Sequence, residues 1–261
     1  MSGNSRARIA LFAALMLLVG LLLPAGLEWL ADRSVGAEQA IPVEAIDYQA
    51  GSGTLIDILN LINSSAEVTQ QEIKEGYNYN RQSALVHAKE LLLSFLTECG
   101  FENAEGWWAE YLGEAKFSCD GLLIAVPDFP TPWSAILWTV NIPYVDGIEI
   151  SVVFDDATGA MLMEHILLEK GQETFAAALR EDGLAQRCAQ AYVKGLDGLE
   201  TAELSLAYAD EDDVEQTWLF SVIDSEGARV DVMMTMLCEA GHASLDVEPM
   251  GNGYENGEWS Y

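Results

Sequence analysis

Two stretches of this sequence, whose leading tryptophans are 80 positions apart, show the same pattern of strand, tight turn and strand. They read WTVNIPYVDGIEISVVFD from Trp138 and WLFSVIDSEGARVDVMMT from Trp218. Each first strand ends at an acidic residue followed by Gly147 or Gly227, a turn sequence typical of hairpins. The pattern predicts two copies of one unit, in which a helix covers one face of an antiparallel sheet. The open alternative is two unrelated hairpins that resemble each other.

Helical periodicity is clearest over 84–96, where the apolar residues form one broad stripe. We expect Asn80 to cap this helix and Gly100 to end it. A second helix is expected over 175–196, with a break at Gly183. The other expected elements are a short amphipathic helix starting at Leu55, a loop over 66–80, and strands over 107–112, 116–126, 136–143, 148–155, 161–168, 203–208, 216–223, 229–237 and 243–247.

Residues 9–27 carry no charge and follow Arg6 and Arg8. As a helix, this segment would be roughly 28 Å long, close to the ~30 Å thickness of a bilayer core. We favour a retained single-pass anchor with a cytoplasmic N-terminus, which places the rest of the chain outside the cytoplasm at the cell membrane. A cleaved signal peptide is the alternative that remains open.

The balance of charge excludes one large class of partners. The chain has 12 Lys and Arg against 42 Asp and Glu, a net charge of −30 at pH 7. Nucleic-acid binding needs a basic face, so no nucleic-acid partner is expected. Because half of the residues are hydrophobic, the chain can still bury a core. The acidic surface favours a protein or peptide partner that is basic.

These features together predict an α+β fold. An N-terminal transmembrane helix is followed by two tandem helix-plus-antiparallel-sheet units. The expected boundaries are 1–30 for a cytoplasmic stub with the anchor or signal, 31–53 for a linker, 54–170 for the first unit, 171–248 for the second, and 249–261 for a disordered tail.

The segment LWTVNIPYVDGIEISVVFDDATGAMLMEHI, with the helix ALVHAKELLLSFL before it, resembles PepSY-like domains. Its mark is the Asp-x-x-Thr-Gly turn from Asp155 to Gly159. The resemblance covers 81–168 and, more faintly, 175–248, where that turn is missing. It implies PepSY-like units of a bacterial, membrane-anchored, extracytoplasmic protein. It also implies an inhibitory, chaperone-like or regulatory binding role without catalytic residues.

Catalytic signatures are absent from the sequence. It holds no H-x-x-x-H, G-x-S-x-G, S-x-x-K or P-loop pattern, so we assign no catalytic residue. The leading prediction is a binding or regulatory accessory protein that is not an enzyme. Two alternatives remain open: an extracytoplasmic hydrolase whose site is built from carboxylates, and a Ca²⁺-binding structural surface protein.

Three groups of residues are candidates for sites. The candidate binding face is aromatic and consists of Trp107, Trp108, Tyr111, Phe129 and Trp133. The candidate Ca²⁺ site is the acidic run Asp210, Glu211, Asp212 and Asp213; no other cofactor is expected. The four cysteines are Cys99, Cys119, Cys188 and Cys238, which allow three disulfide pairings or remain buried thiols.

Overall fold

The structure is a computed structural model. It describes residues 53–62, 68–113, 115–126, 133–145, 147–169, 172–179, 181–210, 215–239, 241–250, 254–255 and 258–259. The helices are α2 (Leu55–Ile62), α3 (Arg81–Cys99), α4 (Ala104–Tyr111), α5 (Gln172–Leu179) and α6 (Leu184–Lys194). The strands are β1 (Thr69–Ile73), β2 (Ser118–Val126), β3 (Trp133–Val145), β4 (Ile148–Asp155), β5 (Met161–Leu168), β6 (Glu200–Ala209), β7 (Glu215–Ile223), β8 (Arg229–Glu239), β9 (His242–Pro249), β10 (Tyr254–Glu255) and β11 (Glu258–Trp259).

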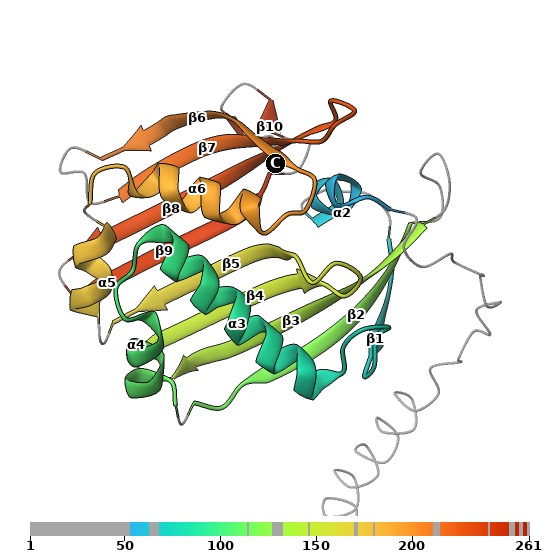
Figure 1. Cartoon of the computed structure of the whole chain (residues 1–261), viewed down its shortest axis with the longest axis horizontal. Coiled ribbons are helices and arrows are strands. Elements are labelled where there is room, and N and C mark those ends of the chain that lie inside the picture. The colour runs from blue at the N-terminus through green and yellow to red at the C-terminus, as the bar shows by residue number, and fades with distance from the viewer. Residues whose placement is uncertain are drawn as a thin grey trace, which may run out of the picture. The chain divides into compact units, whose positions relative to one another are not determined.

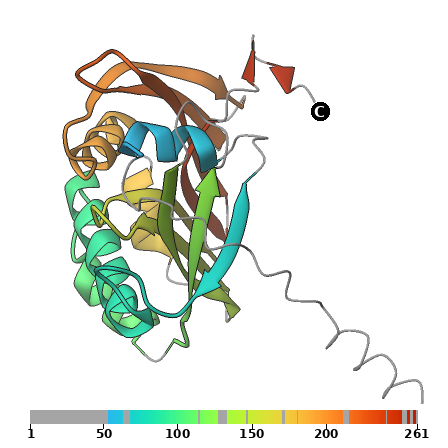
Figure 2. The ribbon, with the colours of Figure 1, turned by 90° about the vertical axis from the view of Figure 1, so that its right-hand side faces the viewer.

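Nine of the strands form one antiparallel sheet in the order β1-β2-β3-β4-β5-β9-β8-β7-β6. The helices α2, α3 and α6 lie on the same face of this sheet (Figures 1 and 2). Helix α3 contacts β2 to β5, and α6 contacts β6 and β7. Within the tail expected to be disordered, β10 and β11 pair with each other.

The core lies between this sheet face and the helices. In β4 the side chains at Ile148, Ile150, Val152 and Phe154 are buried, while those between them are partly exposed. This alternation puts every second residue under the helices. The opposite face carries no helix among the described residues (Figure 2).

The predicted division into two tandem units is wrong. Strand β5 pairs with β9, so the two groups of strands join edge to edge into one sheet. An unpaired strand edge exposes a row of backbone hydrogen-bonding groups, and the β5–β9 pairing removes two such edges. Helices α3 and α6 also pack against each other across this seam. The result is one shared core.

The predicted fold class needs a second correction, at its N-terminal transmembrane helix. None of the helices in the described part of the chain is long and apolar enough to cross a membrane. The segment 9–27, on which that prediction rests, lies outside the described residues.

Among the predictions for single helices, strands and loops, some are confirmed and others are wrong. Asn80 caps α3 by accepting hydrogen bonds from the amides of Gln82 and Ser83, and Gly100 ends the helix with a φ of 100°, as expected. The strand predicted over 107–112 is instead helix α4, because Trp107 and Trp108 are both buried and neighbouring strand residues face opposite ways. The loop predicted over 66–80 contains β1.

Candidate functional site

The turn that follows β4 is closed by its own side chains. One carboxylate oxygen of Asp155 accepts hydrogen bonds from the amide and the hydroxyl of Thr158, at 2.9 and 2.7 Å. The amide of Gly159 donates to the carbonyl of Asp155 at 2.8 Å, and Gly159 has a φ of 70°, which glycine adopts at little cost. The Asp-x-x-Thr-Gly sequence therefore specifies a tight, rigid turn.

Asp156, the next residue, fastens this turn to the loop before α3. Its Oδ2 accepts hydrogen bonds from the amides of Tyr77 and Asn78, at 2.8 and 3.0 Å. Its Oδ1 accepts from the amide of Tyr79 at 3.1 Å and from the indole Nε1 of Trp138 at 2.7 Å. Asp156 is 1% exposed, and these four donors satisfy a buried carboxylate.

An aromatic cluster lies beside the same turn. The rings of Tyr79 and His87 stack with centroids 4.7 Å apart, and both meet Phe154 edge to face. Nε2 of His87 is hydrogen-bonded to the carbonyl of Gly159 at 2.9 Å. Burial, with a smaller effect from Asp156, raises the pKa of the Tyr79 phenol. These contacts fix the loop against α3 and β4.

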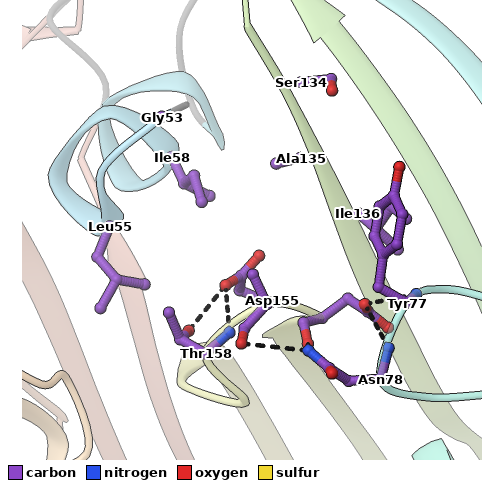
Figure 3. A pocket seen from close by; sticks show the side chains of 12 residues that line it. Gly53, Leu55, Ile58, Tyr77, Asn78, Ser134, Ala135, Ile136, Asp155 and Thr158 are labelled. Atoms are coloured by element: carbon purple, nitrogen blue, oxygen red, sulfur yellow. Dashed lines mark hydrogen bonds between the residues drawn. The ribbon is translucent and has the colours of Figure 1, made fainter. Parts of the chain in front are cut away.

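A pocket of about 300 Å³ opens between α2, this loop, β3 and the turn (Figure 3). Below it is called the α2 pocket. Leu55 and Ile58 of α2 lie on one side of it, and Tyr77 and Asn78 lie on the other (Figure 3). The Tyr77 side chain is 73% exposed beside the opening. The described residues that line it are Gly53, Leu55, Ile58, Tyr77, Asn78, Ser134, Ala135, Ile136, Asp155, Asp156, Ala157 and Thr158.

The α2 pocket combines apolar side chains with two carboxylates. Its described lining holds no histidine, cysteine, lysine or arginine. Its two carboxylates, Asp155 and Asp156, are each 1% exposed and already accept the hydrogen bonds given above. A general base must reach the proton that it abstracts. Both carboxylates are therefore engaged in holding the turn and the loop, and the apolar side chains remain for contact with an occupant.

The structure does not gather the predicted aromatic face into one exposed patch. Trp107 and Trp108 are buried, and Trp108 stacks on Phe117 with ring centroids 5.5 Å apart. Trp133 is buried at the start of β3. Only Tyr111 of the described members is exposed. Phe129 lies outside the described residues.

Trp108 does line a second hollow, which we call the α3–α4 groove. Its volume is about 610 Å³. Val86, 56% exposed, lies on its α3 side, and the ammonium group of Lys89 lies 5.3 Å from the centre of the Trp108 ring. The described lining is Val86, Lys89, Glu90, Leu93, Glu105, Trp108, Ala109 and Gly113.

The acidic run lies mostly beyond what the structure describes. Of its four residues only Asp210 is described, and its carboxylate accepts a hydrogen bond from the amide of Glu215 at 3.1 Å. Among the described residues no cluster of three or more His, Cys, Asp or Glu could hold a metal ion. Glu211, Asp212 and Asp213 lie outside the described residues.

The four cysteines are all buried thiols in this structure. Cys99 ends α3 and Cys188 lies in α6. Burial, with a smaller effect from Cys188, raises the pKa of the Cys99 thiol. Cys119 lies in β2 and Cys238 in β8. Burial raises the pKa of the Cys119 thiol to about 11.

Two further groups escaped the sequence interpretation. Glu164, on the core side of β5, is fully buried, and neither carboxylate oxygen has a hydrogen-bond partner among the described residues. Burial, with a smaller effect from Cys188, raises its pKa well above the ordinary value. The alternation of the strand places Glu164 at an inward position, and this pattern could have indicated a buried carboxylate.

On the face without helices, Nδ1 of His165 contacts Oδ1 of Asp246, its cross-strand neighbour on β9. The hydrogen bond to Asp246 raises the pKa of His165. Ser151 is the neighbour of His165 on β4, but the described residues show no hydrogen bond between the two side chains. The pairing of β5 with β9 creates this contact, so no local sequence pattern could predict it.

Comparison of the chain with models of protein families, with curated proteins and with solved structures gave no match. The site must therefore be interpreted from its own geometry.

Proposed function

We propose that this protein is a non-catalytic binding module with a regulatory or accessory role, and that its α2 pocket holds an apolar side chain of a basic peptide or protein. The observation that carries the proposal is the pocket itself. It joins an apolar wall from Leu55 and Ile58 to an exposed aromatic ring, Tyr77, beside the opening.

The size of the pocket favours a small occupant. Sites for drug-sized molecules run from about 300 to 1,000 Å³, and the α2 pocket lies at the lower end of that range. One large apolar side chain of a partner fits this volume. Exposed aromatic residues such as Tyr77 contribute strongly at protein interfaces.

The loop that carries Tyr77 is held in place before any partner arrives. Asp156 binds the amides of Tyr77, Asn78 and Tyr79. A partner then loses little affinity to the ordering of this loop, because the ordering is already complete. Rigidity of this kind favours recognition of a defined shape.

Charge determines the kind of partner. The chain carries a net charge of −30, so a basic partner is attracted over long range and a strongly acidic one is repelled. On α2 itself, Asp57 adds a negative charge one residue before Ile58. We therefore expect the apolar anchor of the partner to be flanked by lysine or arginine.

Binding is favoured over the hydrolase alternative by the state of the pocket carboxylates. A glycosidase-type mechanism needs two carboxyl groups that face the substrate from opposite sides. Asp155 and Asp156 instead face the backbone amides that they hold. Their contribution is to the shape of the pocket.

The proposal is tested with an array of short peptides in which one Trp, Phe or Leu is flanked by Lys and Arg. The best binder is then titrated against the full chain by fluorescence anisotropy at low and physiological salt. We expect Tyr77→Ala to weaken binding by about tenfold or more. The matched control is Tyr208→Ala, which removes a 52% exposed tyrosine from the edge strand β6 and should leave binding unchanged.

NMR chemical-shift changes on adding the same peptide show independently where on the protein the peptide binds. Shifts centred on Tyr77, Asn78 and Thr158 support the α2 pocket. Shifts centred on Val86 and Leu93, with binding lost in Val86→Asp, would move the partner to the α3–α4 groove and overturn the assignment. Absence of binding by every peptide of the array would count against a basic peptide partner.

A further inference from the structure

We infer that Cys99 and Cys188 are the site of a disulfide bond that joins the end of α3 to α6. Both thiols are fully buried, and they lie on two helices, α3 and α6, that pack against each other. The Cys188 thiol is also one of the neighbouring groups that raise the pKa of Cys99. The residues are 89 positions apart in the sequence, so the fold alone brings them together. This inference is independent of the α2 pocket.

The neighbouring contacts hold the two helices in the required position. Nε of Arg187 donates a hydrogen bond to the carbonyl of Cys99 at 2.7 Å. At the end of α6, six residues after Cys188, the ammonium group of Lys194 lies 2.6 Å from a carboxylate oxygen of Glu98. Both interactions link α6 to the last two residues of α3. A covalent link at this point therefore joins segments that already lie against each other.

Geometry excludes the pairing of the two strand cysteines. Cys119 in β2 and Cys238 in β8 are separated by five strand-to-strand steps in the sheet. At about 4.8 Å for each step, the two strands are roughly 24 Å apart. A disulfide requires Cα atoms within about 7 Å of each other. These two cysteines therefore cannot bridge without unfolding of the sheet.

Cys119 is also far from Cys99. Its neighbour Asp120 lies 3.5 Å from Arg81, at the first residue of α3, whereas Cys99 is the last residue of that helix. The helix has 19 residues and is therefore about 28 Å long. The pairing of Cys99 with Cys188 therefore needs less movement than its pairing with Cys119.

Formation of the bond is an oxidation and needs an external acceptor. The two thiols give up two protons and two electrons to a small disulfide such as oxidised glutathione, which becomes two thiols as the Cys99–Cys188 bond forms. The attacking species is a thiolate. Because burial raises the pKa of Cys99, the exchange takes place while the chain is still folding, before α3 and α6 close over the sulfurs.

The test uses the full chain, unfolded in reductant and refolded in a mixture of reduced and oxidised glutathione. Remaining thiols are alkylated, and the protein is digested and mapped by mass spectrometry without reduction. We expect one cross-linked peptide that contains Cys99 and Cys188, and alkylation of Cys119 and Cys238. Refolding without oxidant should lower the melting temperature by about 5–15 °C.

Two variants separate the bond from a general effect of oxidant. Cys188→Ala should abolish the difference in melting temperature between the oxidised and reduced forms, and Cys238→Ala should retain it. Alkylation of all four cysteines after refolding with oxidant would overturn the inference, as would a cross-link between any other pair. The peptide map of the unaltered chain decides the question even where Cys188→Ala does not fold.

Discussion

The indole Nε1 of Trp138 lies 2.7 Å from Oδ1 of Asp156, so a buried tryptophan of β3 donates to a buried carboxylate in the turn after β4. The same carboxylate holds three consecutive amides of the loop before α3. One residue thereby joins the sheet, the turn and the loop that together build most of the α2 pocket.

Removal of this carboxylate should be among the most damaging single changes. In Asp156→Ala the Trp138 indole and three backbone amides lose their acceptor, and each buried donor left unpaired costs about 1–3 kcal/mol. We expect a loss of about 3–5 kcal/mol in the free energy of unfolding, measured with urea. Asp57→Ala, at a partly exposed site on α2, is the control and should lose about 1 kcal/mol or less. A loss in Asp156→Ala no larger than the control would contradict this account.

Two glycines separate the cost of backbone conformation from that of crowding. Gly159 and Gly227 have φ values of 70° and 87°, so alanine is strained at both, by about 1 kcal/mol. A Cβ at Gly159 would lie 2.8 Å from the Tyr79 hydroxyl and 2.9 Å from Nε2 of His87, whereas a Cβ at Gly227 would have no atom of the described residues within 4 Å. Gly159→Ala should therefore be less stable than Gly227→Ala by about 1–3 kcal/mol in urea unfolding. Equal losses of stability in the two variants would show that Tyr79 and His87 move aside from the new Cβ without cost.

Glu164 should make stability fall as the pH rises. Its pKa is raised in the folded state above the ordinary value of 4.5, so between these values the folded chain retains a proton that the unfolded chain has lost. Each pH unit in this window then lowers stability by up to about 1.4 kcal/mol. The measurement is urea unfolding from pH 5 to 8 for the unaltered chain and for Glu164→Gln. The free energy of unfolding of the unaltered chain should fall more steeply with rising pH than that of Glu164→Gln. Parallel curves would show that Glu164 ionises at its ordinary pKa.

The His165–Asp246 pair should shift an individual titration. The hydrogen bond to Asp246 raises the pKa of His165 above 6.5, so its stabilisation is complete below that pH and is lost as the pH rises through the folded value. Because the His165 side chain is 39% exposed, solvent screens the effect on stability, and NMR titration of the ring is the better readout. Asp246→Asn should lower this pKa, and Asp120→Asn, in β2, should leave it unchanged. An unaltered titration in Asp246→Asn would exclude the pair as the cause.

Local structure was the part of the fold that the sequence could predict. The hairpin around Gly147 follows from alternation and one turn residue, and the structure has β3 and β4 on either side of it. The caps of α3 at Asn80 and Gly100 follow from equally local chemistry. The sequence could not predict which strands pair, because the backbone groups at the edge of β5 can hydrogen-bond to another strand or to water. In the structure this pairing is accompanied by the packing of α3 against α6, which is a contact between distant parts of the chain.

The candidate site shows the same limit. The turn from Asp155 to Gly159 was recognisable, but the inward position of Asp156 depends on a loop that lies almost 80 residues earlier in the chain. Trp107 and Trp108 were expected to belong to an aromatic binding face, but packing against Phe175 and Phe117 buries them instead. Aromatic residues suit a core as well as an interface, so composition alone could not distinguish the two.

The place of β9 in the sheet has a consequence for how this chain is made. Synthesis runs from the N-terminus, yet the last strand of the large sheet lies at its centre, between β5 and β8. Until residues 242–249 have left the ribosome, β5 and β8 each present an open hydrogen-bonding edge to the surroundings. A nascent chain in this state is exposed to aggregation and to chaperones. A message truncated shortly before His242 would leave that state permanent, because strand β9 would never be made.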